Sequence, residues 1–438
     1  MDSAPGAQRR KPMPPNGLRQ FRTEANYMTW LDSRPSGAST TISIVAASLM
    51  GLGVVMVFSA SASLTGPAIT ENVISNPSFR QATFNFAALV IMLMVGLCPY
   101  ESWQIRKGAW FQPALFLALL TLGLLAAVLV PGIGEERNGA RRWLSLGPSS
   151  IGVSFQPSEL AKLTLVVLLA GLCARLGERV RKFWTGLLPM LLIIAVFAGL
   201  VGIEDFGTAA LLGLVGGCML LGAGAKVWHL ALAALPGVVG LVYLIIDKPY
   251  RLERLKTFLD PFADPQGSGY HQVQSLITIA SGGWWGQGLG AGVQKYGYLP
   301  EGRTDFIFAV ICEELGLVGG IAVLGLFAVL LWAGRKAMLR ANTDFGRMLA
   351  LGGTLTIGFQ AAMNVAVVTV SIPTKGIALP LVSAGGTGVL LFGVLLGLMI
   401  NVARRRQGVE TQWAAHPVRG DRADRPAMPI GAAMAAQL

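Results

Sequence analysis

The sequence predicts an all-α, polytopic integral membrane protein with about ten transmembrane helices and one large extracytoplasmic loop. Of its 438 residues, 53% are hydrophobic and only 13% are charged. A soluble domain carries about 25% charged residues. Apolar runs of about 20 residues, long enough to cross a bilayer, recur along most of the chain. This composition strongly disfavours a soluble helical protein with a large core.

We interpret each long apolar run as one span. Short helices or re-entrant pieces would change the count by one or two. The last two spans flank a short polar link, SIPTKG. In chain order, the expected spans are 40–60, 82–100, 109–130, 159–176, 185–203, 207–224, 227–246, 305–333, 347–370 and 378–402.

Basic residues near the span ends predict the orientation, because such residues are retained on the cytoplasmic side. They fall on alternate links if the spans number ten, so both termini are expected in the cytoplasm. The net charge of +12 is then mostly a topology signal with affinity for anionic membrane lipids. Its scatter over many links argues against nucleic-acid binding. The residues concerned are Arg9, Arg10, Lys11, Arg19, Arg22, Arg34, Arg106, Lys107, Arg175, Arg179, Arg181, Lys182, Lys226, Arg335, Lys336, Arg340, Arg347, Arg404, Arg405 and Arg406.

The two ends of the chain differ from the predicted membrane domain, 40–404. Residues 1–39 are polar and basic, and residues 405–438 are rich in Arg, Ala, Pro and Met. We expect both to be disordered cytoplasmic segments. The longest link, 247–304, is the expected extracytoplasmic loop. The four cysteines lie in or beside spans and lack metal-ligand spacing.

Ionisable residues in or beside spans mark candidate functional sites, because a bilayer tolerates them only at a cost. In RRWLSLGPSSIGVSFQPSELAKL, Arg141, Arg142 and Trp143 lie in an outward loop. Glu159 and Lys162 follow at a helix start, where their i, i+3 spacing lets them pair. An interface-anchoring loop followed by a salt-bridged helix start explains this segment at least as well as a functional site.

Two further groups have structural explanations. In EDFGTAA, Asp205 occupies a tight outward turn and is a good helix N-cap. The loop segment 251–294 joins a basic start to Trp284 and Trp285, a composition suited to anionic lipid headgroups. Its GQGLGAG run resembles a nucleotide-binding glycine loop, but no strand precedes it and no proper helix follows it.

Asp305 heads an apolar span in YLPEGRTDFIFAVICEELGLVGG, at the expected extracytoplasmic boundary. On a continuous α-helix, Glu314 lies about 180° around from Asp305, and Glu313 lies about 80° away and about 12 Å deeper. The three carboxylates therefore cannot form one cluster. We expect Glu313 and Glu314 to make buried hydrogen bonds or ion pairs inside the bundle. For Asp305, helix capping and chemistry are equal alternatives, with Thr304 competing for the cap.

Lys375 lies in the outward link SIPTKG, ahead of a Gly/Ser/Thr-rich stretch whose small residues permit close helix packing. It faces the same compartment as Asp305 and the Arg141–Arg142 pair. These residues together predict one outward polar mouth with a carboxylate, several cations and aromatic anchors. Such a mouth suits an amphiphile with an anionic head and a long lipid tail.

Several of these segments closely resemble, in the same order, signatures of the SEDS family (shape, elongation, division, sporulation). They span most of residues 45–402. GLGAGVQKYGYLPE is more similar to the cell-division branch (FtsW-like) than to the elongation branch (RodA-like). The matching segments are YLPEGRTDFIFAVICEELGLVGG, RRWLSLGPSSIGVSFQPSELAKL, DFGTA, RLERLKTFLDPFADPQGSGYHQVQSLITIASGGWWGQGLGAGVQK and FQAAMNVAVVTVSIPTKGIALPLVSAGGTG.

The resemblance implies a multi-pass peptidoglycan polymerase of the bacterial inner (cytoplasmic) membrane, acting at the division septum. It implies transfer of the glycan chain from undecaprenyl pyrophosphate to the 4-hydroxyl of lipid II. Implied partners are a class B penicillin-binding protein transpeptidase (FtsI-like) and other division proteins. A lipid II flippase or other lipid transporter is an alternative, but it needs a polar route across the whole bilayer. A non-catalytic division scaffold is the third possibility.

The resemblance also assigns roles to residues. The family's essential aspartate corresponds to Asp305, acting as a general base or as ligand of a divalent cation (Mg or Mn); we favour the base. Positive charge for the departing diphosphate is expected from Arg141, Arg142 and Lys375, or from that cation. Lys162 is expected to bind substrate or to hold Asp305 ionised. Further substrate contacts are expected at Trp143, Glu301 and Arg303, and structural roles at Gln156, Glu159, Asp205, Glu313 and Glu314.

Four positions depart from the family pattern. Arg303 stands where the family commonly has His, and Glu204 replaces Pro. Ala384 replaces Tyr, and Gly388 replaces the second Ser of the usual SYGGSS. Activity is still expected, with altered substrate contacts near Arg303 and Ala384.

Overall fold

A computed structural model describes residues 36–61, 77–105, 112–137, 140–145, 154–246 and 249–404, which form one compact unit. Of the segments predicted to be disordered, 1–39 and 405–438, Gly37–Ser39 already belong to the first described helix, whereas residues 1–35 and 405–438 lie outside the described residues. The same holds for the basic link residues Arg106 and Lys107.

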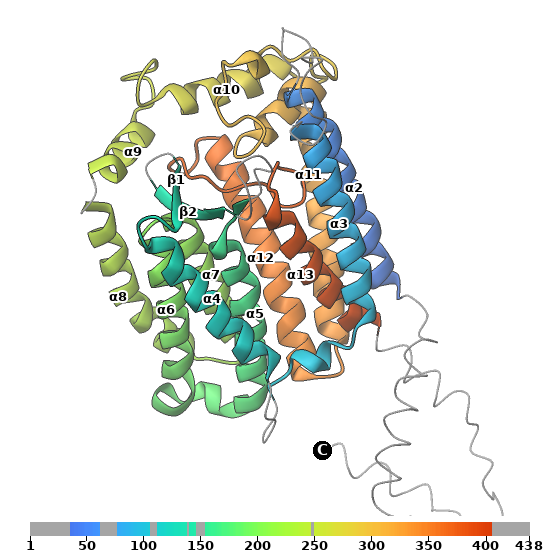
Figure 1. Cartoon of the computed structure of the whole chain (residues 1–438), viewed down its shortest axis with the longest axis vertical. Helices are drawn as coiled ribbons and strands as arrows, with labels where there is room; N and C mark the ends of the chain where they lie inside the picture. The colour runs from blue at the N-terminus through green and yellow to red at the C-terminus, as the bar shows by residue number, and fades with distance from the viewer. Residues whose placement is uncertain are drawn as a thin grey trace, which may run out of the picture. The chain divides into compact units, whose positions relative to one another are not determined.

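The described chain is a helical bundle, as the all-α membrane prediction requires (Figure 1). Seven segments are long and apolar enough to cross a membrane, and three shorter apolar helices complete the ten expected spans. The seven contain α2 (Gly37–Ala60), α3 (Pro77–Leu97), α5 (Pro157–Leu176), α6 (Leu188–Gly202), α11 (Ile307–Arg340), α12 (Asp344–Val368) and α13 (Thr387–Arg404), and the shorter helices are α4 (Pro113–Leu129), α7 (Phe206–Gly222) and α8 (Val227–Ile246). The π-helical turn η4 (Phe183–Leu187) leads directly into α6, and η2 (Tyr100–Trp103) and η3 (Gly177–Arg181) are short turns of 3₁₀-helix.

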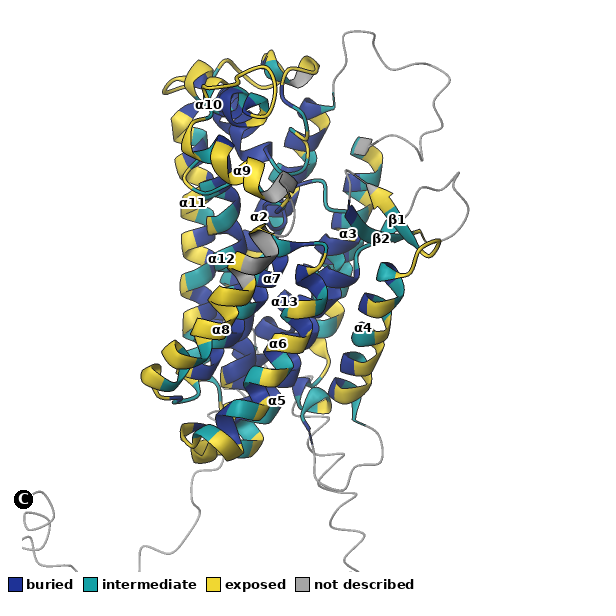
Figure 2. Ribbon diagram, turned by 90° about the vertical axis from the view of Figure 1, so that its left-hand side faces the viewer, coloured by how far each residue is buried: buried dark blue, intermediate teal, exposed yellow. Residues whose placement is uncertain are grey.

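Burial shows which helices form the centre of the bundle. In α13 and α5, 78% and 72% of the membrane-spanning window is buried, whereas in α3 the share is 28% (Figure 2). An apolar helix that is buried on most sides lies inside a bundle, and one that is buried on one side lies at its edge. The centre therefore consists of α5 and α13, and the periphery offers apolar side chains to lipid.

One end of the bundle, which we call the loop end, carries the long connections (Figure 1). There the chain from α8 continues through α9 (Pro249–Leu259), α10 (Tyr270–Gly282) and η5 (Gln294–Tyr296). A small antiparallel sheet, ordered β1 (Gly134–Arg137), β2 (Ala140–Ser145) and β3 (Ser154–Phe155), lies between α4 and α5. This sheet was not among the predicted elements, and its middle strand holds Arg141, Arg142 and Trp143.

The predicted last span began too early, because residues 369–386 form an irregular segment and α13 starts at Thr387. Pro380 cannot donate a helical hydrogen bond, and Leu381 and Gly386 have φ values of +67° and +47°. This segment packs on the backbone of α2, because a Cβ at Gly53 would lie 2.6 Å from the Val382 carbonyl oxygen. Irregular backbone therefore enters the bundle here.

The span predicted at 305–333 is not one continuous helix, because the chain turns back at Gly316. Gly316 has φ +71° and ψ −177°, which no helix allows. A Cβ at Gly320 would lie 2.9 Å from Cys312 Sγ and 3.5 Å from Phe308 Cζ. In a straight helix these residues would be about 12 and 18 Å apart along the axis. Residues 307–315 therefore form a re-entrant helix, and residues 317–340 cross the bundle.

This turn overturns the prediction that Glu313 and Glu314 lie deeper than Asp305 inside the bundle. The Glu314 carboxylate accepts hydrogen bonds from Ser59 Oγ (2.6 Å), near the loop-end terminus of α2, and from the Gly290 N–H (3.1 Å). Glu313 Oε1 accepts from two N–H groups of the loop, at Val293 (2.8 Å) and Gln294 (3.2 Å). The predicted buried hydrogen bonds of both carboxylates are confirmed, but these bonds hold the loop to the bundle.

The backbone around Asp305 lies further from the loop end than the Glu313 and Glu314 carboxylates. Ser383 Oγ donates to the Thr304 carbonyl oxygen at 2.6 Å, and the preceding residue, Val382, packs on Gly53. Gly53 precedes Ser59 by six residues, or about 9 Å of helix. Asp305 thus lies below the rim of the bundle at the base of the re-entrant helix.

The turn at Gly316 predicts that alanine destabilises the protein at position 316 but not at position 325 of the same helix. Gly316→Ala is expected to lower the free energy of unfolding by at least about 1–3 kcal/mol, because alanine disfavours the positive φ and its Cβ would lie 2.3 Å from the Trp284 carbonyl oxygen. Gly325→Ala, in the crossing part of α11 with no neighbour within 4 Å, is the matched control and should not destabilise. Thermal unfolding in detergent measures both. Equal melting temperatures for the two variants would contradict the re-entrant turn.

Candidate active site

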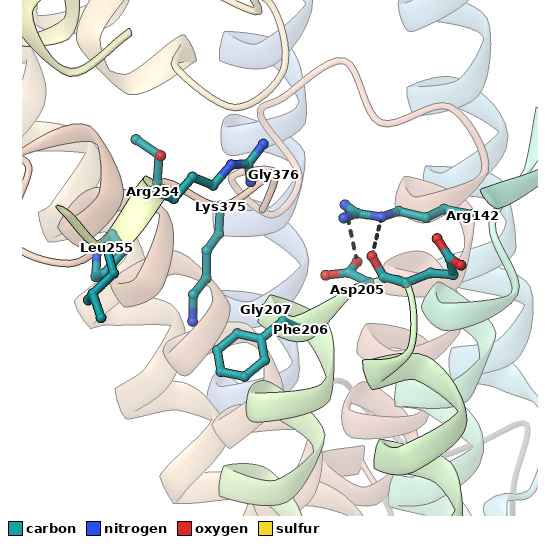
Figure 3. Close-up of a pocket in the computed structure, with 11 residues that line it drawn as sticks. Arg142, Asp205, Phe206, Gly207, Arg254, Leu255, Lys375 and Gly376 are labelled. Carbon is teal, nitrogen blue, oxygen red and sulfur yellow. Dashed lines mark hydrogen bonds and ion pairs between the residues drawn. The ribbon is translucent and has the colours of Figure 1, made fainter. Parts of the chain in front are cut away.

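A pocket of about 110 Å³ opens at the loop end, between β2, the start of α7, α9 and the irregular segment 369–386 (Figure 3). Cationic and acidic side chains face one another across it. Its lining residues are Arg142, Glu204, Asp205, Phe206, Gly207, Arg254, Leu255, Pro373, Thr374, Lys375 and Gly376.

The start of α7 fixes Arg142 in this pocket. Arg142 Nε donates to the Glu204 carbonyl oxygen at 2.8 Å, and its terminal nitrogen lies 4.0 Å from Asp205 Oδ2 (Figure 3). Asp205 caps α7 by accepting from the Thr208 N–H (3.1 Å) and the Thr208 hydroxyl (2.8 Å). A carboxylate with these bonds is held firmly, so it holds the guanidinium in place as well.

Arg141 and Arg142, predicted as a pair, are separated by the strand. Neighbouring residues of a β-strand point to opposite faces. Arg141 Nε lies 3.4 Å from Glu136 Oε2, in an exposed ion pair away from the pocket. The Arg141 N–H donates to Glu204 Oε2 at 2.9 Å, so the glutamate that departs from the family pattern links β2 to the α6–α7 turn.

Lys375 and Arg254 bring two more cations to the pocket from separate elements. Lys375 Nζ lies 4.4 Å from the centroid of the Phe206 ring. Burial lowers the pKa of Lys375, and the charge of Asp205 opposes this shift. Arg254 belongs to α9. Arg254 was not predicted as a site residue, because α9 and α7 are far apart along the chain and the sequence carries no signal of their proximity.

Asp305 does not line the pocket but lies directly behind Gly376. A Cβ at Gly376 would sit 3.1 Å from Asp305 Oδ2 and 3.8 Å from an Arg142 terminal nitrogen. The absent side chain thus leaves a gap between the carboxylate and the guanidinium. Burial first, then the charges of Glu301 and Asp205, raise the pKa of Asp305 to about 7, against the lowering effect of Arg142 and Arg254.

Two polar side chains of the irregular and helical segments hold Asp305 at this gap. Asn364 Nδ2 donates to the carbonyl oxygens of Asp305 (2.8 Å) and Ile377 (2.7 Å). Ser383 Oγ accepts from the Leu379 N–H at 2.7 Å and donates to the carbonyl of Thr304. Neither residue was predicted from the sequence, although a polar amide within an apolar helix is a recognisable signal.

Lys162 pairs with Glu159, as its spacing predicted, and with Gln360 rather than with Asp305. Its Nζ is buried and donates to Glu159 Oε1 (2.7 Å) and Gln360 Oε1 (2.6 Å). The i, i+3 pair is thus present, and Gln360 in turn donates to the Ala378 carbonyl oxygen at 2.9 Å. Lys162 therefore orients Gln360, which in turn holds the backbone of the irregular segment 369–386 at Ala378.

The other predicted residues lie around the site without lining the pocket. Glu301 is exposed and accepts from Thr304 Oγ1 at 2.8 Å, close enough to influence Asp305. Arg303 is exposed, and its carbonyl accepts from the Ala384 N–H at 3.0 Å. Trp143 pairs with Glu135 in the sheet. Gln156 occupies the N-cap position of α5 without a side-chain capping bond.

Gly388, the fourth departure from the family pattern, lies against the buried ion pair. A Cβ there would be 3.1 Å from Glu159 Oε2. A serine at this position would thus reach the Glu159 carboxylate, which here pairs with Lys162.

The arrangement is suited to transfer of a group between a hydroxyl and a phosphate. A half-buried carboxylate with a pKa near neutrality can accept a proton. Arg142, Lys375 and Arg254 can stabilise negative charge that develops beside it. Among the residues that the structure describes, no three His, Cys, Asp or Glu side chains converge on a metal position. A divalent cation would therefore share Asp305 with phosphate and water, as magnesium commonly does.

Comparison with known proteins identifies the chain's relatives. The profile of the family described as "Cell cycle protein" (FtsW, RodA, SpoVE) matches residues 39–408. The probable peptidoglycan glycosyltransferase FtsW of Nitrosococcus halophilus is 43% identical over 82% of this chain and 90% of its own.

Two solved structures are similar as well. A chain from a peptidoglycan synthase complex that coordinates polymerization and crosslinking matches with TM-score 0.64 and 28% identity, over 83% of this chain and 97% of that one. The rod shape determining protein RodA of Thermus thermophilus matches with TM-score 0.55 and 25% identity, over 83% and 96%. The profile match, which covers nearly the whole described chain, shows that this protein belongs to the FtsW/RodA/SpoVE family.

Proposed function

We propose that this protein is a peptidoglycan glycosyltransferase that polymerises lipid II for septal cell-wall synthesis. The observation that carries the proposal is the gap at Gly376, with the Asp305 carboxylate on one side and the Arg142 guanidinium on the other. The relatives named FtsW glycosyltransferase support the reaction class and the division branch.

In the proposed reaction, Asp305 accepts the proton of the lipid II 4-hydroxyl as that oxygen attacks the anomeric carbon of the growing chain. The bond between this carbon and undecaprenyl pyrophosphate breaks, and the diphosphate leaves with the electron pair. Arg142 is held where it can stabilise the leaving group. Lys375 and Arg254 add charge from the other walls of the pocket.

Asp305 could instead hold a divalent cation (Mg or Mn) that binds the diphosphate. The carboxylate beside a pocket rich in cations fits either role, and the donor set suits a cation that keeps water and substrate phosphate as ligands. We favour the base, because burial raises the pKa of Asp305 to about 7, where a group exchanges protons most effectively at neutral pH.

We further propose that the loop end faces the outside of the cytoplasmic membrane and both termini face the cytoplasm. Arg335, Lys336 and Arg340 end the crossing part of α11 at the opposite end of the bundle, as expected for a cytoplasmic face. A class B penicillin-binding protein is the proposed partner, supported by the similarity to a chain of a peptidoglycan synthase complex. Other division proteins at the septum would join this pair.

Replacing Asp305 tests the reaction. Asp305→Asn preserves the shape and removes the base, so polymerisation of lipid II by the protein with its partner should fall by about 10²–10⁴-fold. Gel analysis of labelled glycan products measures it, with partner binding as the folding control. Unchanged polymer from the variant would overturn the role of Asp305 as the base. Absence of polymer from the wild type would favour a scaffold, and transbilayer movement of lipid II without polymer would favour a transporter.

Chelation distinguishes the two roles of Asp305. If it acts as a base alone, wild-type product formation should persist in EDTA, whereas a metal-ligand role requires loss of product that Mg²⁺ or Mn²⁺ restores.

The pKa of Asp305 predicts the pH dependence. A base must be ionised, so kcat/KM should rise with pH through a midpoint near the pKa of about 7 and level off above it. Glu301→Gln removes a charge that raises this pKa, and the midpoint should move to lower pH. The measurement is the rate of polymerisation as a function of pH. An identical midpoint in the variant would show that Glu301 does not act on the titrating group.

The two arginines of β2 provide a matched comparison. Arg142→Gln should lower the polymerisation rate by about 100-fold, the usual effect of losing a donor to developing charge. Arg141→Gln should change it by less than about fivefold, because Arg141 loses only an exposed ion pair. Rates are compared at equal amounts of partner-bound protein. Equal losses would show that the strand does not separate the two side chains as described.

A further inference from the structure

Two of the apolar helices begin with the same three-residue pattern, Lys-x-Trp. Lys182 and Trp184 lie at the start of η4, which leads into α6, and Lys226 and Trp228 lie at the start of α8. Both starts belong to the end of the bundle opposite the loop end (Figure 1). These four residues have no role in the proposed reaction, because the candidate active site lies at the other end.

Side-chain contacts show that the two helix starts are neighbours. The ring centroids of Phe183 and His229, one from each start, are 5.5 Å apart. A Cβ at Gly224, in the turn before α8, would lie 3.7 Å from Arg181 Nε. The two starts therefore form one surface, which we call the basic patch and which consists of Arg181, Lys182, Trp184, Lys226 and Trp228.

The basic patch lies in a strongly cationic region. Within the described residues, none of the cations of this region forms an ion pair. Residues 175–187 contain one carboxylate, that of Glu178, and residues 221–230 contain none. The excess of exposed positive charge favours an anionic ligand. The exposed cations are Arg175, Arg179, Arg181, Lys182 and Lys226.

The two tryptophans place the basic patch at the level of lipid headgroups. Trp184 and Trp228 are 75% and 76% exposed. Trp184 is the second residue of the apolar segment Phe183–Gly202, and Trp228 is the second of Val227–Gly240. Both rings therefore lie where an apolar helix meets a group of cations, the position in which tryptophan is enriched in membrane proteins. The first N–H groups of a helix have no acceptor within it and also favour an anion.

We propose that the basic patch binds the headgroup of an anionic phospholipid, with cardiolipin, which carries two phosphodiesters, as the best-matched ligand. Each Lys-x-Trp start supplies one cation and one indole ring, and the two starts lie side by side. Basic pockets between membrane helices bind such headgroups. An acidic protein segment would complement the charge alone, whereas a lipid complements both the charge and the rings at the ends of apolar helices.

A bound headgroup would tie α8 to the rest of the bundle. From Ala231 to Gly240, every residue of α8 except Ala233 is exposed, so this helix has little packing of its own. A ligand shared by the starts of α6 and α8 would join them at the end opposite the loop. In the proposed topology this end faces the cytoplasm, but binding itself requires neither that orientation nor the glycosyltransferase activity.

Native mass spectrometry of the full-length protein measures the binding without relying on activity. The purified chain is titrated in detergent with cardiolipin or with phosphatidylethanolamine, and the wild type should retain one cardiolipin molecule in preference to the zwitterionic lipid. The variant Arg181→Gln/Lys182→Gln/Lys226→Gln should raise the apparent Kd for cardiolipin by about 100-fold, because each basic residue near a membrane surface contributes about a fivefold gain in affinity.

A matched control removes the same charge elsewhere at this end of the bundle. Arg335→Gln/Arg340→Gln/Arg347→Gln replaces three exposed cations outside the basic patch and should bind cardiolipin as the wild type does. Equal weakening in both variants would overturn the site in favour of a general effect of charge. Displacement of cardiolipin by millimolar inorganic phosphate would show a site for free anions. No preference of the wild type for cardiolipin would refute the lipid and favour an acidic protein segment.

Photo-crosslinking provides a second measurement if the triple variant does not fold. The photoreactive residue p-benzoylphenylalanine replaces either Thr185, exposed beside Trp184, or Leu119, exposed on α4, in vesicles of cardiolipin and phosphatidylethanolamine. Adducts at position 185 should be enriched in cardiolipin several-fold over the vesicle composition, whereas adducts at position 119 should match it. Adducts of bulk composition at both positions would refute the site.

Discussion

The structure depends on how this protein satisfies backbone polar groups where the chain is not helical inside the bundle. Irregular backbone at membrane depth is tolerated only when its N–H and C=O groups find partners within the protein. Asn364 and Gln360, one helical turn apart on α12, bond the carbonyl oxygens of Asp305, Ile377 and Ala378. These two amides join the segment before α11 to the segment before α13.

That junction creates the candidate site. It places Asp305 beside Gly376, and Gly376 opens onto a pocket where Arg142, Lys375 and Arg254 arrive from three different elements. The charges are separated along the chain but share one small space. Lys162 adds a further buried contact next to this junction. It pairs with the Glu159 carboxylate and donates a hydrogen bond to Gln360. Arg142 and Lys162 are thus held by hydrogen-bond partners, Arg142 by the Glu204 carbonyl oxygen and Lys162 by Glu159 and Gln360.

The loop end also shows how a membrane enzyme can tie a large external segment to its bundle. The buried carboxylates of Glu313 and Glu314 accept backbone N–H groups of the loop, and Gly316 reverses the chain beside Trp284. The re-entrant helix between Asp305 and these glutamates is therefore fixed at both ends. A site built on such an element keeps its geometry even though the loop above it carries much exposed surface.

The sequence by itself determined the membrane class, the ten apolar segments, Asp305, Arg142 and Lys375 as candidate site residues, and the pairing of Glu159 with Lys162. These are local properties, because an apolar run, an i, i+3 spacing or a charge beside a span is visible within one contiguous stretch of sequence. Only the tertiary structure decided that Arg141 points away, that Lys162 binds Gln360, and that Glu313 and Glu314 lie nearer the rim than Asp305. The reason is physical: each of these outcomes depends on a strand pairing, a distant partner or a chain reversal at one glycine, and none has a local signal.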